Sequence, residues 1–312
     1  MIPTRGRESR LAFALEALSR QTLAPDRFEV IVVRDGDCSP PLAEAPDGLE
    51  VRYFTRDGVA GPTSKRNVGW RNANAPLVAF TDDDCRPDPA WLASLVDAAG
   101  DDSTFLQGRT EPDPEERYLM PGLARTQEIL KPTGWFETCN VAYPRGLLER
   151  LGGFDEAFGF GGEDTDLAYR ALEAGAQARF VSAARVWHAV VPRSLFGALR
   201  DAVRWTDVAA VVARHPSLRR SLHRGVFWYP AHERLLLAVT AVGLGRSRLP
   251  LPVRVLGSAL AFPYFDMRVN WRQPTLRRTS LQLLALPAWA LVDTVEALSR
   301  LPGALRRRIL IV

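Results

Sequence analysis

Three consecutive aspartates carry the clearest chemical signal in this chain. Asp82, Asp83 and Asp84 directly follow residues 77–81, an apolar run that predicts a β-strand. Because adjacent carboxylates repel one another and are costly to desolvate, the triplet predicts either a solvated turn or a divalent-metal site. Ligands of open α/β sheets bind at the carboxyl ends of strands, which favours the metal site. Alternate residues share a face, so Asp82 and Asp84 are the expected ligands, and their oxygens predict Mg²⁺ or Mn²⁺.

A second acidic cluster follows a glycine-rich segment, residues 152–162. Glu163, Asp164 and Asp166 open a predicted helix that continues to about residue 174. Acids at a helix N-terminus often only cap the helix and match its dipole, which accounts for one or two of them. The glycine-rich approach suggests in addition that a substrate passes close by. A carboxylate held there could act as a general base toward a hydroxyl group.

Several single residues add weaker signals. His188 ends a strand-like run and is either a packed residue or a third metal ligand through its neutral imidazole. Lys65, Arg66 and Asn67 lie in the predicted helix before the acidic strand, where they are either solvated or close to a diphosphate or sugar. Asp35 ends another strand and is either a plain turn residue or an acceptor for a base or ribose.

The elements that position these residues alternate along the chain. Helical patterns cover residues 8–20, 62–74 and 90–99, and strand patterns cover residues 28–33, 49–54 and 77–80. In the first helix, Leu11, Leu15 and Leu18 share one face. Strands that alternate with helices of this length predict an α/β fold with a mostly parallel sheet flanked by helices.

Composition narrows the setting. The 312 residues are 46% hydrophobic and 24% charged, as in an ordinary globular protein. Three cysteines, Cys38, Cys85 and Cys139, are odd in number and lack metal-ligand spacing, which indicates a reducing compartment. No secretory signal precedes Pro3, so we expect a cytoplasmic location.

Charge divides the chain in two. Residues 1–190 carry a balance of −9 and residues 191–312 a balance of +13, which together give the net charge of +4. We therefore expect an acidic catalytic domain over 1–190 and a helical C-terminal region over 191–312. The basic region predicts an anionic partner, either a membrane surface or nucleic acid. Nucleic acid is the weaker option because the region is apolar and holds no known binding module.

The C-terminal region also contains three apolar segments, residues 235–244, 255–265 and 281–292. Arginines interrupt or flank them, and no uncharged apolar stretch reaches the roughly 20 residues that a spanning helix needs. Amphipathic helices at the inner face of the cell membrane fit better, with aromatic residues as interface anchors: Trp228, Tyr229, Trp271 and Trp289. The alternative is a helical subdomain that packs on the catalytic domain or on a second copy.

The order of these motifs resembles the family-2 inverting glycosyltransferases of the GT-A fold. The resemblance covers residues 2–190 and rests on segments that follow one another as in that family: Pro3-Thr4-Arg5-Gly6-Arg7, Val32-Val33-Arg34-Asp35-Gly36, Lys65-Arg66-Asn67, Asp82-Asp83-Asp84, Gly152-Gly153-Phe154-Asp155, Gly162-Glu163-Asp164-Thr165-Asp166-Leu167 and His188. It implies a nucleotide-sugar-binding sheet and a UDP-, GDP- or dTDP-linked donor, with Mn²⁺ or Mg²⁺ at the diphosphate. The acceptor does not follow from the resemblance: from the basic, apolar C-terminal region alone we expect a hydroxyl of a lipid-linked or cell-surface glycan.

The resemblance also implies roles for residues. Asp84, Asp82 and His188 would bind the metal, and Asp164, beside Glu163, would be the catalytic base. The implied donor-binding residues are Pro3, Thr4, Arg7, Asp35, Lys65, Arg66, Asn67, Asp82 and Asp83, and the implied acceptor-side residues are Trp135, Asn140 and Asp166.

One departure from the pattern of processive family members limits the expected activity. Arg204-Trp205 is similar to the Gln-x-x-Arg-Trp signature of processive members, but Asp201 stands in place of the glutamine, so a polymerase is not expected.

The alternatives are a soluble nucleotidyltransferase of the same fold and a non-catalytic binding protein. Residues 3–10 lack the glycine-rich phosphate loop of the former, and both acidic motifs argue against the latter.

Overall fold

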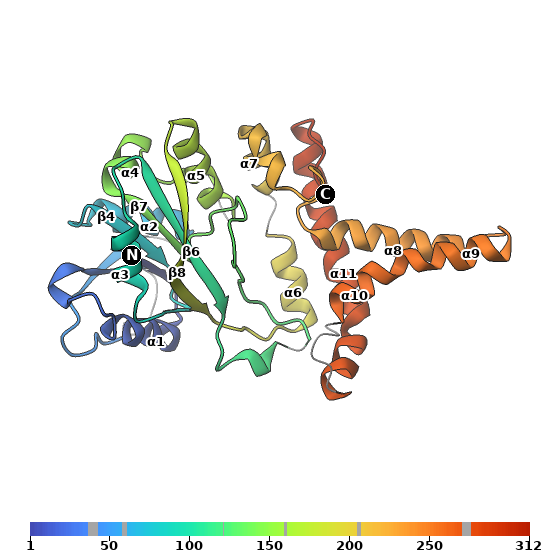
Figure 1. Ribbon diagram of the computed structural model, residues 1–312, viewed down its shortest axis with the longest axis horizontal. Helices are drawn as coiled ribbons and strands as arrows, with labels where there is room; N and C mark the ends of the chain where they lie inside the picture. The colour runs from blue at the N-terminus through green and yellow to red at the C-terminus, as the bar shows by residue number, and fades with distance from the viewer. Residues whose placement is uncertain (37–42, 58–60, 121, 159–160, 205–206, 270–275) are drawn as a thin grey trace. The chain divides into compact units, whose positions relative to one another are not determined.

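The structure is a computed structural model that describes residues 1–36, 43–57, 61–120, 122–158, 161–204, 207–269 and 276–312, with side chains from residue 279 in the last range. Cys38, Trp205 and Trp271, named above, lie outside the described residues. The chain forms two compact units (Figure 1). The first comprises Met1–Arg117 and Thr126–Val190, and the second comprises Tyr118–Arg125 and Val191–Val312.

The first unit is built on two sheets. A parallel sheet has the order β1-β2-β3, and a five-stranded sheet has the order β4-β7-β6-β8-β5. The strands are β1 (Ile2–Thr4), β2 (Val30–Asp35), β3 (Val51–Arg56), β4 (Leu77–Thr81), β5 (Cys85–Pro87), β6 (Thr104–Pro112), β7 (Asn140–Pro144) and β8 (Gln177–His188). The amide of Thr81 donates to the carbonyl of Met1 at 3.2 Å, so β1 runs beside β4 and joins the two sheets.

Helices flank these sheets. They are α1 (Glu8–Ser19), α2 (Pro62–Arg71), α3 (Trp91–Ala98), α4 (Arg145–Leu151) and α5 (Glu163–Glu173), and short 3-10 turns are η1 (Pro25–Arg27) and η2 (Arg117–Leu119). Leu11, Leu15 and Leu18 of α1 are buried, as the helical spacing predicts. They share a hydrophobic core with Val32 of β2 and Trp91 of α3.

The sequence patterns predict helices α1, α2, α3 and α5 and strands β2, β3, β4 and β8 to within a few residues, but the strand directions are more mixed than expected. Parallel pairing holds for β1–β2, β2–β3 and β6–β8. The pairs β4–β7, β6–β7 and β5–β8 are antiparallel. The physical reason is that β5 and β7 are entered from turns rather than from crossover helices, so they run back along their neighbours.

The second unit is helical. Its elements are α6 (Leu195–Ala202), α7 (Val208–Arg214), η4 (Pro216–Ser221), α8 (Pro230–Arg246), α9 (Leu251–Ser258), η5 (Ala259–Ala261), α10 (Phe262–Arg268) and α11 (Leu276–Arg306). Val292 of α11 packs with Ala198 and Ala202 of α6. The three apolar segments therefore fall in α8, in α9 to α10, and in α11.

One helix among the described residues passes a length and composition test for crossing a membrane. It is the part of α11 from Thr279 to Arg306, and only 11% of its most apolar window is buried within the chain. The sequence analysis did not expect this helix to be long and apolar enough to cross a membrane, because it considered only stretches without charged residues. It is weak evidence, because α11 carries the buried Asp293, which accepts from Tyr264 at 2.6 Å and pairs with Arg268.

The aromatic residues proposed as membrane anchors are mostly packed inside the second unit. Trp228 is buried, stacks on Tyr229 at 4.6 Å and lies 3.8 Å from the guanidinium carbon of Arg300. The indole of Trp289 donates to the carbonyl of Gly122 at 3.1 Å and lies under Arg268. The anchor assignment of Trp228 was therefore wrong, because the ring is buried within the unit. Trp289 is only partly buried, and its anchor role stays a prediction.

Candidate functional site

The three aspartates occupy the turn between β4 and β5, and each has different partners. Asp83 is fully buried; the hydroxyl of Thr4 donates to it at 2.6 Å, and Arg7 pairs with it. Burial raises the pKa of Asp83 to about 6, although Arg7 acts in the opposite direction. Asp83 and Thr4 thus hold each other and Arg7 in place. The buried carboxylate of Asp83 is thus not accessible for the donor contact that the resemblance implies.

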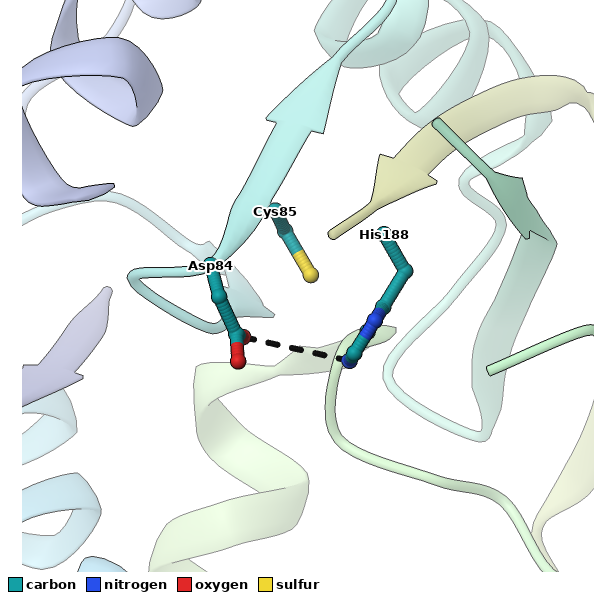
Figure 2. A group of neighbouring side chains, drawn as sticks. All are labelled: Asp84, Cys85 and His188. Atoms are coloured by element: carbon teal, nitrogen blue, oxygen red, sulfur yellow. Dashed lines mark ion pairs between the residues drawn. The ribbon is translucent and has the colours of Figure 1, made fainter. Parts of the chain in front are cut away.

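Asp84 and His188 come together through strand pairing. In the antiparallel pair β5–β8, Cys85 lies opposite His188, and the amide of Ala189 donates to the carbonyl of Asp84 at 2.9 Å. The imidazole Nε2 of His188 lies 3.8 Å from the Asp84 carboxylate (Figure 2). Among the described residues, Asp84, Cys85 and His188 form a group that could hold a metal ion.

The hydrogen bonds of His188 suit a metal ligand. Its Nδ1 lies 2.9 Å from the carbonyl oxygen of Ala189, and a carbonyl can only accept. Nδ1 therefore carries the proton, and the lone pair of Nε2 is directed to the side where Asp84 lies. The gap of 3.8 Å is too long for a hydrogen bond. It is shorter than two metal–ligand bonds of about 2.1 Å laid end to end, so a cation fits between the two side chains.

Cys85 is a neighbour rather than a fitting ligand for such a cation. The residue is fully buried in the hydrophobic core, and burial raises the pKa of its thiol. A hard cation such as Mg²⁺ or Mn²⁺ prefers oxygen and nitrogen to a neutral thiol. The fit therefore rests on Asp84 and His188.

The predicted third ligand, Asp82, is not part of this group. Its carboxylate pairs with Arg66 at 3.0 Å. Of the three residues that the sequence predicts to share one ion, Asp84 and His188 therefore lie together, whereas Asp82 lies apart from them. The reason is that the chain turns after Thr81, so strict alternation does not extend through the triplet.

Arg66 links the two acidic motifs. This buried guanidinium pairs with Asp82 at 3.0 Å and with Glu163, the first residue of α5, at 2.9 Å. The end of β4 and the N-terminus of α5 therefore lie within the span of one side chain. Removing the Arg66 side chain would leave the buried carboxylate of Glu163 without this partner, which is strongly unfavourable. Arg66 and Glu163 thus serve to hold the two motifs together.

Asp164 is placed differently from its neighbours. Its carboxylate accepts from the Thr165 amide at 2.8 Å and is half-buried in the first turn of α5. Burial raises the pKa of Asp164, and the nearby carboxylates of Glu163 and Glu137 raise it further, against the effect of Arg66. A carboxylate whose proton affinity is increased in this way is suited to accept a proton.

The segment before β7 contacts the same helix end. The hydroxyl of Thr165 donates to the carbonyl of Trp135 at 2.7 Å. Glu137 accepts from Gln107 at 3.0 Å, and burial raises the pKa of Glu137 as well. Sequence reasoning did not single out Glu137, because a lone acid in an apolar segment gives no signal of the charge that it faces.

Asp35 and Lys65 form a buried pair at the end of β2. The ammonium of Lys65 lies 2.9 Å from Asp35, and Arg5 lies 3.4 Å from the same carboxylate. Pro3 and Thr4 lie on the neighbouring strand β1, also buried. Lys65 thus neutralises Asp35 in this structure, which the separate sequence assignments of the two residues did not anticipate.

Three other predicted site residues have structural roles. Asn67 of α2 donates to the carbonyl of Phe154 and accepts from its amide, at 2.9 and 3.0 Å. Asp166 is buried and pairs with Arg170 at 2.8 Å. Asn140 is buried, accepts from Trp91 at 2.9 Å and donates to two backbone carbonyls. These contacts within the chain occupy Asn67, Asn140 and Asp166, so the donor contact of Asn67 and the acceptor contacts of Asn140 and Asp166 are not supported.

The glycine-rich approach to α5 also has a packing cause. Gly153 has φ of +76°, and a Cβ there would lie 2.5 Å from the Trp70 indole nitrogen and 2.6 Å from the Asn67 oxygen. Only glycine allows this approach. Close substrate approach is thus not needed to explain Gly153.

Comparisons with known proteins agree with this architecture. Residues 1–153 match the model of glycosyl transferase family 2. Validoxylamine A glucosyltransferase from Streptomyces hygroscopicus subsp. limoneus is 29% identical over 280 residues, which cover 75% of this chain and 61% of that protein. Pre-mycofactocin glycosyltransferase from Mycobacterium tuberculosis is 27% identical over 207 residues, which cover 61% and 43%. This chain thus spans about three fifths, or less, of the length of these relatives.

A solved structure has the same fold. It is the mannosyltransferase PcManGT from Pyrobaculum calidifontis in complex with GDP-Man and Mn²⁺, with a TM-score of 0.62 and 22% identity, covering 94% of this chain and 85% of that one. The family match over residues 1–153 and this likeness in fold lead to one conclusion: the first unit has the GT-A fold of the family 2 glycosyltransferases.

Proposed function

We propose that this chain transfers a sugar from a nucleotide-sugar donor to an acceptor hydroxyl, with a divalent cation at the donor diphosphate and inversion at the anomeric carbon. One observation carries the proposal. Arg66 joins the acidic turn, which also holds Asp84 beside His188, to the N-terminus of α5, which holds Asp164. A cation-binding pair and a carboxylate of raised pKa therefore belong to one connected network.

Asp84 and His188 would hold the cation, Mn²⁺ or Mg²⁺. When bound, such an ion offsets the negative charge that develops on the departing nucleoside diphosphate. Arg7 pairs with Asp84 and so orients its carboxylate. PcManGT, whose fold is similar, was solved with GDP-Man and Mn²⁺, and this supports a nucleotide-sugar donor and a divalent ion.

Asp164 would act as the general base. In a single in-line displacement, one carboxylate accepts the proton of the acceptor hydroxyl while that oxygen attacks the anomeric carbon, and the configuration inverts. Glu163 is paired with Arg66 and is thus less suited to this role, so we assign the base to Asp164 alone. Trp135 stays a candidate on the acceptor side, because its carbonyl contacts Thr165 next to the base.

The acceptor is proposed from the second unit. Its basic and apolar surface supports peripheral contact with the inner face of an anionic membrane, and hence a lipid-linked or cell-surface glycan as acceptor. Nothing observed favours the nucleotidyltransferase alternative or a non-catalytic role. A carboxylate of raised pKa and a pair of side chains that could hold a cation have no purpose in a scaffold protein.

A donor screen tests the proposal directly. UDP-, GDP- and dTDP-linked sugars are added to the full chain with Mn²⁺, with Mg²⁺ or with EDTA, and melting temperature and slow donor hydrolysis are recorded. We expect one nucleotide class to stabilise the chain, by about 2.7 kcal/mol at 100 times its Kd, only when the metal is present. Neither stabilisation nor hydrolysis with any of the donors would contradict the proposal.

The pKa of Asp164 leads to a second prediction. Because the negative charge of Glu137 disfavours ionised Asp164, Glu137→Gln should lower the pKa of Asp164. Asp164 acts deprotonated, so the acid limb of the pH profile of kcat/KM should move to lower pH. Glu128→Gln, the same change at an exposed acid that does not act on the pKa of Asp164, should leave the limb in place. A limb that does not move in Glu137→Gln would separate Asp164 from the proton transfer.

A further inference from the structure

We propose that the helical hairpin formed by α8 and α9 is the membrane-docking element of this chain and that it lies along the headgroup boundary of an anionic bilayer. This deepens the membrane contact in the proposed function by naming the segment that makes it. The two helices lie side by side, joined by a short turn at residues 247–250 (Figure 1).

Glycines allow the two helices to approach closely. Gly257 of α9 is buried against Leu244 of α8, and a Cβ on Gly257 would lie 2.7 Å from a methyl carbon of that leucine. Arg254 also donates to the carbonyl of Gly245 at 3.0 Å. Small residues at a helix–helix seam allow close approach without a layer of large apolar side chains.

The large apolar side chains point outward instead. Leu256 is 77% exposed and Leu251 is 67% exposed, and other exposed residues on or next to the hairpin are Leu236, Val239, Val242, Leu249, Val253, Val255, Leu260 and Phe262. A soluble helical pair buries such residues and exposes polar ones, so this hairpin has the reverse arrangement. A surface of this kind indicates a contact with an apolar partner.

Charge decides between a lipid surface and a second copy of the chain. Residues 234–265 contain four arginines and no acidic residue. Glu233, at the start of this stretch, is already paired with His223 and Arg224. A two-fold contact between two hairpins would bring arginines together without acidic partners on this face. Lipid phosphates supply those partners, so the observations favour an anionic membrane.

The arginines also decide how the hairpin lies. Arg246 and Arg248 are exposed and flank the turn between the helices. If the hairpin entered the bilayer end-on, these two charges would reach the hydrocarbon region, which is costly. The 17 residues of α8 measure about 25 Å, less than the roughly 30 Å of the hydrocarbon core. Lying in the interface keeps the arginines at the headgroups and the leucines and valines among the upper acyl chains.

Vesicle binding by the full chain tests this assignment. Co-sedimentation is measured with vesicles of phosphatidylcholine alone and with vesicles containing phosphatidylglycerol, at low and high salt. We expect binding only to the anionic vesicles, weaker at high salt. Leu251→Ser with Leu256→Ser should lower the partition coefficient at least about tenfold. Arg246→Gln with Arg248→Gln should lower it about fivefold per arginine.

The controls separate this inference from the proposed function. Leu130→Ser changes an exposed leucine of the first unit and should bind vesicles as the unchanged chain does. Both hairpin variants should keep their melting temperature and their hydrolysis of the donor in solution. Equal vesicle binding by the hairpin variants and the unchanged chain would overturn the assignment. So would a dimer of the unchanged chain, seen by light scattering, that the hairpin variants lose. Vesicle binding without donor hydrolysis would instead overturn the proposed function alone.

Discussion

Asp164→Asn should abolish sugar transfer while leaving the fold and donor binding intact. The substitution keeps the size of the side chain and its contact with the Thr165 amide but removes the group that would accept the proton. General bases contribute about 10²–10⁴ to the rate, so we expect kcat/KM to fall about a thousandfold. The measurement is steady-state transfer with the donor found by the screen, together with donor affinity by calorimetry.

Glu173→Gln is the matched control for this variant. It makes the same type of change at the other end of α5, at an exposed position. It should keep transfer within about twofold, since surface substitutions are usually within ±0.5 kcal/mol. Transfer by Asp164→Asn at the rate of this control would show that another group accepts the proton. Loss of donor binding in Asp164→Asn would show instead that the residue holds the donor.

Asp84→Ala and His188→Ala should each remove binding of Mn²⁺. Each substitution deletes one of the two side chains that face one another at 3.8 Å. Substitution of a residue that only orients a metal ligand lowers metal affinity about 10–100-fold, so loss of a ligand itself should lower it at least about a hundredfold. The free-Mn²⁺ signal in electron paramagnetic resonance, titrated with and without the nucleoside diphosphate, gives a readout that does not depend on turnover.

Two further variants make this prediction specific. Asp97→Asn changes an exposed acid of α3 and should bind Mn²⁺ as the unchanged chain does. Cys85→Ala should also keep its affinity, because a buried neutral thiol is a poor ligand for this ion. A large loss of Mn²⁺ affinity in Cys85→Ala alone would place the ion on the thiol and reject the Asp84–His188 assignment.

Much of the architecture follows from local patterns. The spacing of Leu11, Leu15 and Leu18 predicts α1, and the apolar run before Asp82 predicts β4, because each pattern reports a buried face within a few residues. The order of motifs likewise suffices to predict the family and the fold. The charge division along the chain falls at the same place as the change from the first unit to the helical second unit.

The pairing of distant side chains is not contained in such patterns. Asp84 meets His188 only because β5 and β8 pair in one register, and a shift of one residue would turn the imidazole to the opposite face. Asp35 and its two partners, Lys65 and Arg5, come from three different segments of the chain. Sequence inspection assigned Asp35 and Lys65 to a ligand because it had no means of seeing that these two charges neutralise one another.

Tertiary packing also decides which residues of a given type are free to contact a ligand or a membrane. Asn140 is of a residue type common in binding sites, and Trp289 is of a type common at membrane interfaces. The side chain of each instead donates hydrogen bonds to backbone carbonyls within the chain. Leucines and valines of the α8–α9 hairpin, which periodicity alone would assign to a core, are exposed. The hydrophobic pattern, the acids and the family are properties of neighbouring residues and are readable along the chain. Burial, protonation and partner choice are properties of space, because they depend on which distant groups displace water around each side chain.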